Sequence, residues 1–553
     1  MNLRTYYSTR YSTRKTHQSK PIPGTGQVRN SAGGHAWAVD DWARLDRFLV
    51  LGSESGSYYA FARELTVANA EAVARLLDLD GGRVVARVVE ISHSGRAGKN
   101  DPALFALAMA AGMGDAVTRA AALEALPRVA RTGTHLFHFL HYVEGFRGWG
   151  RGLRRGVGRW YTDMAAGCLA YQAIKYQRRD GWSHRDALRL AHPTAPTEAH
   201  NAIFQWITQG WEGVGAEPHP DETLRQLWAF ERARVAQDEA EIVALVDEYK
   251  LPWEAIPTKW LKSARVWAML LPGLPVNATL RNLARMTANG LLTPMSAESH
   301  MVVDRITDPQ ALAKARVHPI AVLSALLTYS QAEGVRGSLR WKPVGEIVDA
   351  LDRAFYLSFK TVKPTRKRIM LALDVSGSMA GPHMARVPGL TPRVGAAAIA
   401  LITAATEPNY MVTIFSSAGK RYMEPRGKKS WQNDGIGSFS ISPRQRLDDV
   451  VKATTGLPFG DTDVALPMLY ALERGLRVDA FVVYTDSETW YGDIHPVQAL
   501  ERYRQQSGIP AKLVVVGMVS NGFSVADPDD GGMLDVVGFD TVAPRLISEF
   551  IAS

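Results

Sequence analysis

Apolar residues recur at helical spacing through the first two thirds of the chain. From Asp40 to about Lys360 they fall at i, i+3, i+4 and i+7, the period of an amphipathic helix. Clear examples are VANAEAVARLLDLD (67–80), HRDALRLAH (184–192), DEAEIVALVDEYK (238–250) and AVLSALLTYSQA (321–332). Polar, Gly- or Pro-containing breaks separate such segments, and no convincing series of strands interrupts them. Many medium-length helices in succession predict a stacked helical array or α-solenoid, although no sequence repeat of fixed period is evident.

The period changes after about residue 361. Short β-branched apolar runs follow, namely KRIMLALD (367–374), YMVTIF (410–415), AFVVYTD (480–486) and AKLVVVGM (511–518). Helical stretches alternate with them, namely PRVGAAAIALITAAT (392–406), DVALPMLYALERG (463–475), HPVQALERYRQQS (495–507) and PRLISEF (544–550). This alternation predicts an α/β domain, a doubly wound parallel sheet with helices on both faces. Sheets of this kind bind ligands outside the carboxyl ends of their strands.

Oxygen-bearing side chains gather where the predicted strands end. The sequence ALDVSGSMAG (372–381) places a carboxylate and two hydroxyls at every second residue after the first strand, and GDTD (460–463) and YTDSET (484–489) follow. The candidate metal ligands are Asp374, Ser376, Ser378, Thr462 and Asp486. Hard oxygen ligands of low total charge suit Mg²⁺, with Mn²⁺ or Ca²⁺ as alternatives, and leave a position open for a partner's anionic oxygen. The alternative interpretation is a strand-to-helix turn with capping hydroxyls.

Length and composition narrow the class of protein. With 553 residues, 46% apolar and 22% charged, the chain is a globular protein of two or more domains. Its longest apolar runs, 102–113 and 394–405, reach about a dozen residues, fewer than the roughly 20 that cross a bilayer. The single cysteine, Cys168, excludes an internal disulfide framework and fits a reducing compartment. We therefore expect a cytoplasmic protein without a membrane span.

The excess of positive over negative charge lies entirely in the first part of the chain. The net charge is +9, yet the residues from Thr361 onward hold 20 Lys and Arg against 20 Asp and Glu. Such asymmetry indicates that the first part meets a polyanion. The first 39 residues contain no Asp or Glu and six Lys or Arg, which is typical of a flexible basic arm. A mitochondrial leader has a similar composition, but Pro21 and Pro23 follow and no apolar helical face is evident.

Basic and aromatic residues are interleaved between Arg147 and Arg189. The ten basic residues are Arg147, Arg151, Arg154, Arg155, Arg159, Lys175, Arg178, Arg179, Arg185 and Arg189, and only three aspartates oppose them. The interleaved aromatic residues are Trp149, Trp160, Tyr161, Tyr171, Tyr176 and Trp182. Guanidinium groups at helical spacing favour phosphate contacts, and aromatic rings stack on unpaired bases. The alternative is that the arginines are solvated helix surface and the tryptophans are core.

Long blocks of the sequence resemble one known family. DVSGSM (374–379), GDTD and YTDSET match the metal-ion-dependent adhesion site of the von Willebrand factor A fold. The tail VVVGMVSNGFSVADPDDGGMLDVVGFDT (514–541) is similar to that of the Ro autoantigen proteins, which join such a domain to a helical TROVE domain. Further matching blocks are RLDRFLVLGSESGSYY (44–59), RGWGRGLRR (147–155), KYQRRDGWSHRD (175–186), NLARMTANGLL (282–292) and ARVHPIAVLSALLTY (315–329). From about Val28 the chain thus resembles the Ro autoantigen family.

The resemblance implies two domains, a TROVE domain of HEAT-like repeats forming a ring (28–360) and a von Willebrand factor A domain (361–553). The basic arm (1–27), inferred from composition, precedes them and has no counterpart in the family pattern. It also implies a noncatalytic, monomeric RNA-binding protein. Such proteins bind small Y RNAs on a basic outer surface and single-stranded 3′ ends of misfolded noncoding RNAs in a central hole. They act in RNA quality control, and bacterial relatives cooperate with exoribonucleases.

RNA contacts are implied at five positions of KYQRRDGWSHRD, namely Lys175, Arg178, Arg179, His184 and Arg185. The block departs from the family pattern, with Gln177 where Lys is expected and Asp180 where Asn is usual. This leaves open which of Arg178 and Arg179 makes the contact. On residue type alone, His184 is more typical of a structural or capping histidine.

Other chemistries lack their motifs. The sequence contains no P-loop, no HExxH and no CxxC, and its glycine clusters lack dinucleotide-binding spacing. Two hypotheses remain: a noncatalytic RNA-binding ring with a structural or partner-binding metal site, and a protein-interaction scaffold that captures a partner carboxylate at the metal.

Overall fold

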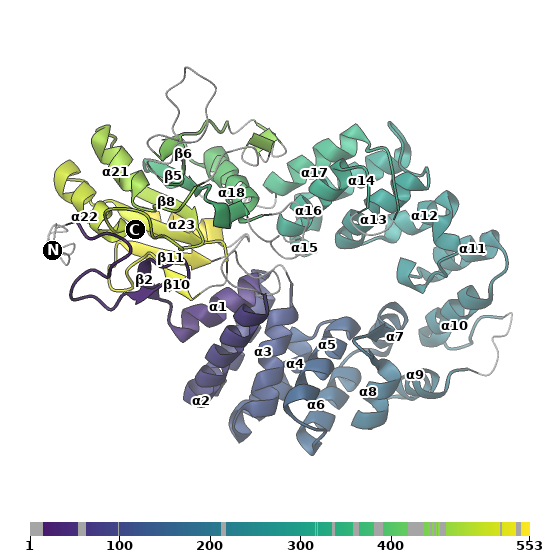
Figure 1. The fold of residues 1–553 in the computed structure, drawn as a ribbon. Helices are drawn as coiled ribbons and strands as arrows, with labels where there is room; N and C mark the ends of the chain where they lie inside the picture. The colour runs from purple at the N-terminus through teal and green to yellow at the C-terminus, as the bar shows by residue number, and fades with distance from the viewer. Residues whose placement is uncertain are drawn as a thin grey trace.

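The chain folds into a curved array of helices whose two ends meet an α/β domain (Figure 1). The computed structural model describes residues 15–52, 62–97, 99–211, 217–315, 317, 319–334, 338–357, 364–380, 391–417, 435–442, 445–446, 449–450, 452–453, 460–519, 522–537 and 543–553. In Figure 1 the helices follow one another round a ring, and the α/β domain joins the first to the last. Within the described part, no helix is both long and apolar enough to span a bilayer.

The helical region runs from α1 to α17. Its first helices are α1 (Asp41–Leu51), α2 (Ala62–Ser94), α3 (Asp101–Met113), α4 (Ala116–Val129), α5 (Gly133–Phe146), α6 (Arg151–Thr162), α7 (Ala166–Lys175), α8 (His184–Ala191) and α9 (Glu198–Gln209). The rest are α10 (Glu222–Val235), α11 (Glu239–Tyr249), α12 (Ala264–Leu270), α13 (Val276–Ala288), α14 (Ala297–Thr307), α15 (Pro309–Lys314), α16 (Pro319–Ser330) and α17 (Gly345–Leu357). Side-chain caps start many of them; Ser183 and Asp186, for example, form a capping box at α8.

The α/β domain contains a six-stranded sheet of order β11-β9-β8-β5-β6-β7. Its strands are β5 (Ile369–Asp374), β6 (Tyr410–Phe415), β7 (Ile436–Ser438), β8 (Ala480–Thr485), β9 (Lys512–Gly517) and β11 (Met533–Val537). All neighbours are parallel except β6 and β7. The predicted parallel sheet is thus confirmed, with an antiparallel edge strand that the sequence analysis did not anticipate.

Alternate residues of the central strand enter two separate cores. Leu371 and Leu373 pack with α18 (Pro392–Thr406) and α23 (Ala543–Ala552). Met370 and Ala372 pack on the opposite face with α21 (Leu466–Glu473) and α22 (Pro496–Ser507). Because side chains of a strand point alternately to its two faces, a continuous apolar strand requires helices on both.

The segment before α1 belongs structurally to the α/β domain. The strand β2 (His35–Ala38) pairs with β1 (Val28–Arg29) and with β10 (Phe523–Ser524), both antiparallel. Gln18 is fully buried, and its amide nitrogen donates to Asp463 Oδ1 at 2.7 Å and to the Ile494 carbonyl at 2.8 Å. We call residues 15–39 the N-terminal strap.

The strap corrects two sequence-based predictions. Residues 15–27 were expected in a flexible arm but are packed against the α/β domain; residues 1–14 lie outside the described residues. A helical-repeat domain was expected over 28–360, with its helical pattern starting at Asp40; the stretch from 28 to 39 instead forms strands that complete a sheet with β10. Strands of two and four residues are too short to show a period-2 pattern in the sequence, so only pairing reveals them.

Both ends of the helical array are fastened to the α/β domain. In α1, Arg47 has a side chain 1% exposed, and its guanidinium pairs with Asp535 of β11 at 2.5 Å and donates to the Phe523 carbonyl at 2.8 Å. At the other end, the Tyr356 hydroxyl of α17 donates to the Gln445 carbonyl at 3.1 Å, and Asp349 pairs with Arg446. The ring therefore closes within one chain.

Replacing Arg47 by Met should lower the free energy of unfolding by about 3 kcal/mol, because Asp535 would keep its charge without its partner. Urea unfolding followed by tryptophan fluorescence measures the loss. Arg75→Met is the matched control, since Arg75 pairs with Asp41 but is more than half exposed, and it should change stability little. Equal losses in the two variants would contradict a closing role for Arg47.

Candidate nucleic-acid interface and metal centre

The helix α6, whose sequence is RGLRRGVGRWYT, packs Gly152 and Gly156 against α4. A Cβ atom placed on Gly156 would lie 3.1 Å from Leu123 Cβ of α4, and one on Gly152 would lie 3.4 Å from Leu123 Cδ1. These short distances favour glycine, so α6 packs very closely against α4. Leu153, Val157 and Trp160 enter the core. Arg159 also faces α4, because its guanidinium donates to the Leu123 carbonyl.

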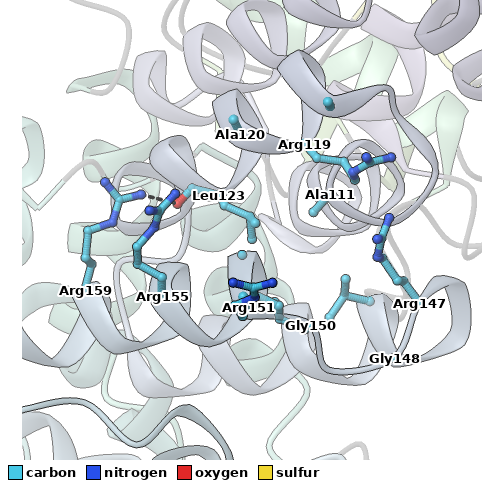
Figure 2. A pocket seen from close by; sticks show the side chains of 14 residues that line it. Ala111, Arg119, Ala120, Leu123, Arg147, Gly148, Gly150, Arg151, Arg155 and Arg159 are labelled. Atoms are coloured by element: carbon cyan, nitrogen blue, oxygen red, sulfur yellow. Dashed lines mark hydrogen bonds between the residues drawn. The ribbon is translucent and has the colours of Figure 1, made fainter.

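The close packing forms a pocket of about 240 Å³ between α4 and the segment from Arg147 to Arg159. Five arginines line it: Arg119, Arg147, Arg151, Arg155 and Arg159. Figure 2 shows Arg119 and Arg147 toward one end, Arg155 and Arg159 toward the other, and Arg151 between them. The other lining residues are Ala, Gly, Val and Leu, so none of the described residues brings a carboxylate into the pocket. We call it the arginine pocket.

Four of the predicted RNA contacts therefore lie together, and one residue that the sequence analysis missed joins them. Arg147, Arg151 and Arg155 are exposed, Arg159 is half-buried, and Arg159 Nη2 donates to the Leu123 carbonyl at 3.2 Å. Arg119 comes from α4, and its guanidinium donates to the Gly114 carbonyl at 2.6 Å. Nothing in the local sequence of α4 marks Arg119, because only the packing of α6 brings it to the pocket.

The remaining predicted arginines are exposed but lie outside the pocket. Arg154 is on the same helix but does not line the pocket, and Arg185 is on α8. Arg178 and Arg179 form the strand β3 (Arg178–Arg179), which pairs with β4 (Trp182–Ser183). The hairpin turns at Asp180 and Gly181, which both have positive φ. Asp180 also pairs with His138 of α5, so its side chain holds the hairpin against the helix.

Lys175 lies in a different environment. Its Nζ is 3.8 Å from Glu254 Oε1 and donates to the Tyr171 hydroxyl at 3.2 Å. These residues line a second pocket of about 320 Å³ together with Trp253. Because a carboxylate and a phenol share its charge, Lys175 is less available to a phosphate than the exposed arginines.

His184 does not lie on the predicted surface. Its side chain is buried against Trp160 and Phe137, and the Tyr161 hydroxyl is 2.8 Å from its Nδ1. Burial lowers the pKa of His184 to about 4, so the imidazole is neutral near neutral pH. Trp160, Tyr161 and Trp182 are buried as well, so they are core residues rather than platforms for bases. The buried aromatic residues agree with the alternative interpretation of this stretch, in which they are core. The RNA contact of His184 stays a prediction.

The candidate metal ligands meet at the carboxyl edge of the sheet. Asp374 ends β5; its Oδ1 accepts from the Ser376 amide at 2.8 Å and its Oδ2 from the Thr485 hydroxyl at 2.7 Å. The hydroxyl oxygens of Ser376 and Ser378 are 3.0 Å apart. Ser378 also bonds to the carboxyl of Asp486, which follows β8. All four side chains are buried.

The loop that carries Thr462 is anchored between the two strand ends. The Gly377 amide donates to the Gly460 carbonyl at 3.2 Å, and the amides of Trp490 and Tyr491 each donate to the Thr462 carbonyl at 3.2 Å. Thr462 Oγ1 is buried and has no hydrogen-bond partner among the described residues. A buried hydroxyl without a partner is costly, whereas a cation or its water would use the oxygen.

Electrostatics at this edge also fit a cation. Burial, with the neighbouring Asp374 and Glu488 as further causes, raises the pKa of Asp486 to about 8. Burial raises the pKa of Asp374 as well. Glu488, which the sequence analysis left out, accepts from the Ala32 amide of the N-terminal strap at 3.1 Å. No group of three or more His, Cys, Asp or Glu suited to a metal occurs in the described ranges, so hydroxyls would have to complete the coordination.

Comparison with known proteins follows the division seen in the structure. The TROVE domain model matches residues 28–217 and 247–328, and the Ro60 vWA domain model matches 368–551. The RNA-binding protein RO60 of Deinococcus radiodurans is 43% identical over 526 residues, which are 95% of each chain. The chain belongs to the Ro60 family. RO60 of Caenorhabditis elegans is 34% identical over an alignment of 600 residues, covering 95% of this chain and 90% of its own.

A solved structure agrees with the fold of this Ro60 family member. The crystal structure of the Deinococcus radiodurans Ro (Rsr) protein has a TM-score of 0.70 at 42% identity, covering 93% of this chain and 99% of that chain. The predicted family and the predicted order of a helical TROVE region and a von Willebrand factor A domain are therefore confirmed.

Without a divalent cation, the contribution of Asp486 to stability should fall as the pH rises from about 4 to about 8. In the unfolded chain Asp486 ionises near its ordinary value of 3.8, but in the fold it keeps its proton up to about 8, so ionisation favours unfolding in this window. Mg²⁺ would replace that proton. The gain in melting temperature on adding Mg²⁺ should therefore be larger near pH 8.5 than near pH 6, measured against EDTA.

Three variants test whether the effect of Mg²⁺ on the melting temperature comes from this site. Asp374→Ala should abolish the Mg²⁺ effect, and Asp486→Asn should remove its dependence on pH. Asp479→Asn, which breaks a pair with Arg368 near the start of β8, should keep the Mg²⁺ effect. A melting temperature of the wild type that does not respond to Mg²⁺ would show that the edge is only a capped turn.

Proposed function

We propose that this protein is a noncatalytic RNA-binding ring. The observation that carries the proposal is the set of arginines on α6 and around the arginine pocket, which lack carboxylate partners among the described residues. Guanidinium groups left unpaired in a pocket and on the neighbouring surface suit phosphates. The Deinococcus and Caenorhabditis relatives are both named RNA-binding protein RO60, which supports the same conclusion.

The proposal has two binding modes. Small Y-type noncoding RNAs lie on the surface that includes Arg154, Arg155, Arg178, Arg179 and Arg185, held mainly through phosphates. A single-stranded 3′ end of a misfolded or structured RNA enters the ring of Figure 1. In this role the protein acts in RNA quality control in the cytoplasm, together with an exoribonuclease that shares the RNA.

The closure of the ring supports action as a monomer. Arg47 and Tyr356 fasten the two ends of the helical array to one α/β domain, so a second chain is not needed to complete the ring.

The metal site supports a second candidate function, a protein-interaction scaffold. Asp374, Ser376, Ser378, Thr462 and Asp486 would hold Mg²⁺, with Mn²⁺ or Ca²⁺ as alternatives. When bound, such an ion supplies positive charge to an anionic oxygen such as a partner's carboxylate. The observation that favours it is the buried Thr462 hydroxyl, which has no hydrogen-bond partner in the described part of the chain. It lies at the same edge of the sheet as the buried carboxylates of Asp374 and Asp486. The two functions are compatible, because the arginine pocket lies in the helical region.

Reversing charge at Arg154, Arg155 and Arg178 should weaken binding of structured RNA of any sequence. It should also reduce the slope of log K against log salt by about 0.9 for each phosphate that the variant no longer binds. Mobility shifts at several salt concentrations measure both quantities. Reversal of Arg474 and Arg477 in the α/β domain is the control for net charge and should leave both nearly unchanged. If the first set also left affinity and slope unchanged, the scaffold would become the better explanation.

The purified protein should neither cut RNA nor hydrolyse nucleoside triphosphates in Mg²⁺. The hydroxyls of Ser376 and Ser378 bond to one another, the two carboxylates would be engaged by the cation, and the sequence has no P-loop. Labelled RNA and released phosphate provide the assays. RNA cleavage that requires Mg²⁺ and disappears in Asp374→Ala would overturn the noncatalytic assignment.

A further inference from the structure

The arginine pocket holds more positive charge than an internal phosphate of an RNA chain can balance. Five guanidinium groups converge there, from α4, from the segment before α6 and from α6 itself. Within the described residues none of them forms an ion pair; the hydrogen bonds of Arg119 and Arg159 go to backbone carbonyls, which leave the charge uncompensated. An internal phosphodiester carries one negative charge, whereas a terminal triphosphate carries between about three and four.

The backbone adds donors to the same place. Gly148, Gly150 and Gly152 line the pocket, and Gly150 is the N-cap residue of α6 without a side chain to cap it. The first amides of the twelve-residue helix therefore have no side-chain acceptor at the cap, and the helix dipole favours an anion there. Arg159 Nε is buried and has no hydrogen-bond partner in the described part of the chain.

The size of the site favours a group larger than a single phosphate. A volume of about 240 Å³ holds several water-sized groups, so a single phosphate would leave part of the lining unmet. Arg154 is exposed on the same helix outside the lining, and offers internal phosphates a contact next to the pocket.

We propose that the arginine pocket binds a terminal triphosphate group, and that the group is the unprocessed 5′ end of an RNA whose backbone continues over the adjacent basic surface. The proposal rests on the proposed function, because it names which part of the RNA the pocket takes. A free nucleoside triphosphate presents the same chemistry and is the alternative source of the group.

The test compares one RNA sequence carrying a 5′ triphosphate, a 5′ monophosphate or a 5′ hydroxyl, with binding measured on the full-length protein. The triphosphate form should bind about tenfold more tightly than the hydroxyl form, since it adds several charge-assisted hydrogen bonds. Arg151→Gln combined with Arg155→Gln should remove the difference. Neither side chain has a hydrogen bond or ion pair with the described residues, so the double variant should keep its circular dichroism spectrum and melting temperature.

Arg154→Gln is the matched control. It should weaken the three forms by the same factor and leave the preference for triphosphate intact. Direct titration with a nucleoside triphosphate distinguishes the two sources. If the free nucleotide binds as tightly as the triphosphate RNA and the double variant abolishes that binding, the pocket recognises the group itself without the RNA.

Two different results would overturn the proposal, and they can be distinguished from one another. Equal affinity of the wild type for all three 5′ ends, with charge reversal still reducing affinity, would mean that the pocket takes internal phosphates and that only the triphosphate assignment fails. Absence of binding to any form of the RNA would contradict the proposed function. In that case the titration with a free nucleoside triphosphate would still show whether the pocket binds a triphosphate group, and no binding there would overturn the proposal.

Discussion

The architecture depends on a buried ion pair between the first helix and the last strand of the sheet. Arg47 of α1 and Asp535 of β11 are separated by almost the entire chain, and the Arg47 side chain is withdrawn from water. Removing a guanidinium from water is unfavourable unless a partner and further acceptors satisfy it, and here Asp535 and the Phe523 carbonyl do so. Because hydrophobic contacts alone tolerate sliding, this directional pair sets where α1 docks. The strand pairing of β2 with β10 adds a second directional constraint next to it.

The segment next to the closing contact also packs against the candidate metal site at the carboxyl edge of the sheet. The N-terminal strap lies across the loops that follow the central strands, where Gln18 bonds to Asp463 and the Asn30 side chain donates to the Thr489 carbonyl at 2.8 Å. Burial raises the pKa of Asp463 to about 6, so the strap helps to hold a cluster of carboxyl groups away from solvent. The loops would be more exposed without it. One segment thus connects the start of the helical array to the edge of the sheet where a cation would bind.

The basic surface results from packing in the helical region. Gly152 and Gly156 allow α6 to approach Leu123, and the same contact brings Arg119 of α4 beside the arginines of α6 that line the pocket. A larger residue at Gly156 would separate the two helices and disperse the charge. The aromatic residues of the same stretch have the opposite role, because Trp160, Tyr161 and Trp182 fill the core around the neutral His184.

The two regions, the family, the strand that ends in Asp374 and the strand that Asp486 follows could all be predicted from the order of the residues. Periods of 3.6 and 2 residues are local properties, and strand ends of a parallel sheet meet at one edge whatever the details of packing. Which side chains share a site depended instead on how distant elements pack. Arg119 joined the pocket, His184 entered the core, Lys175 was paired with Glu254, and residues 15–27 became a strap rather than an arm. Each outcome depends on contacts between residues far apart in the chain, and a local pattern of polar and apolar positions carries no information about such partners.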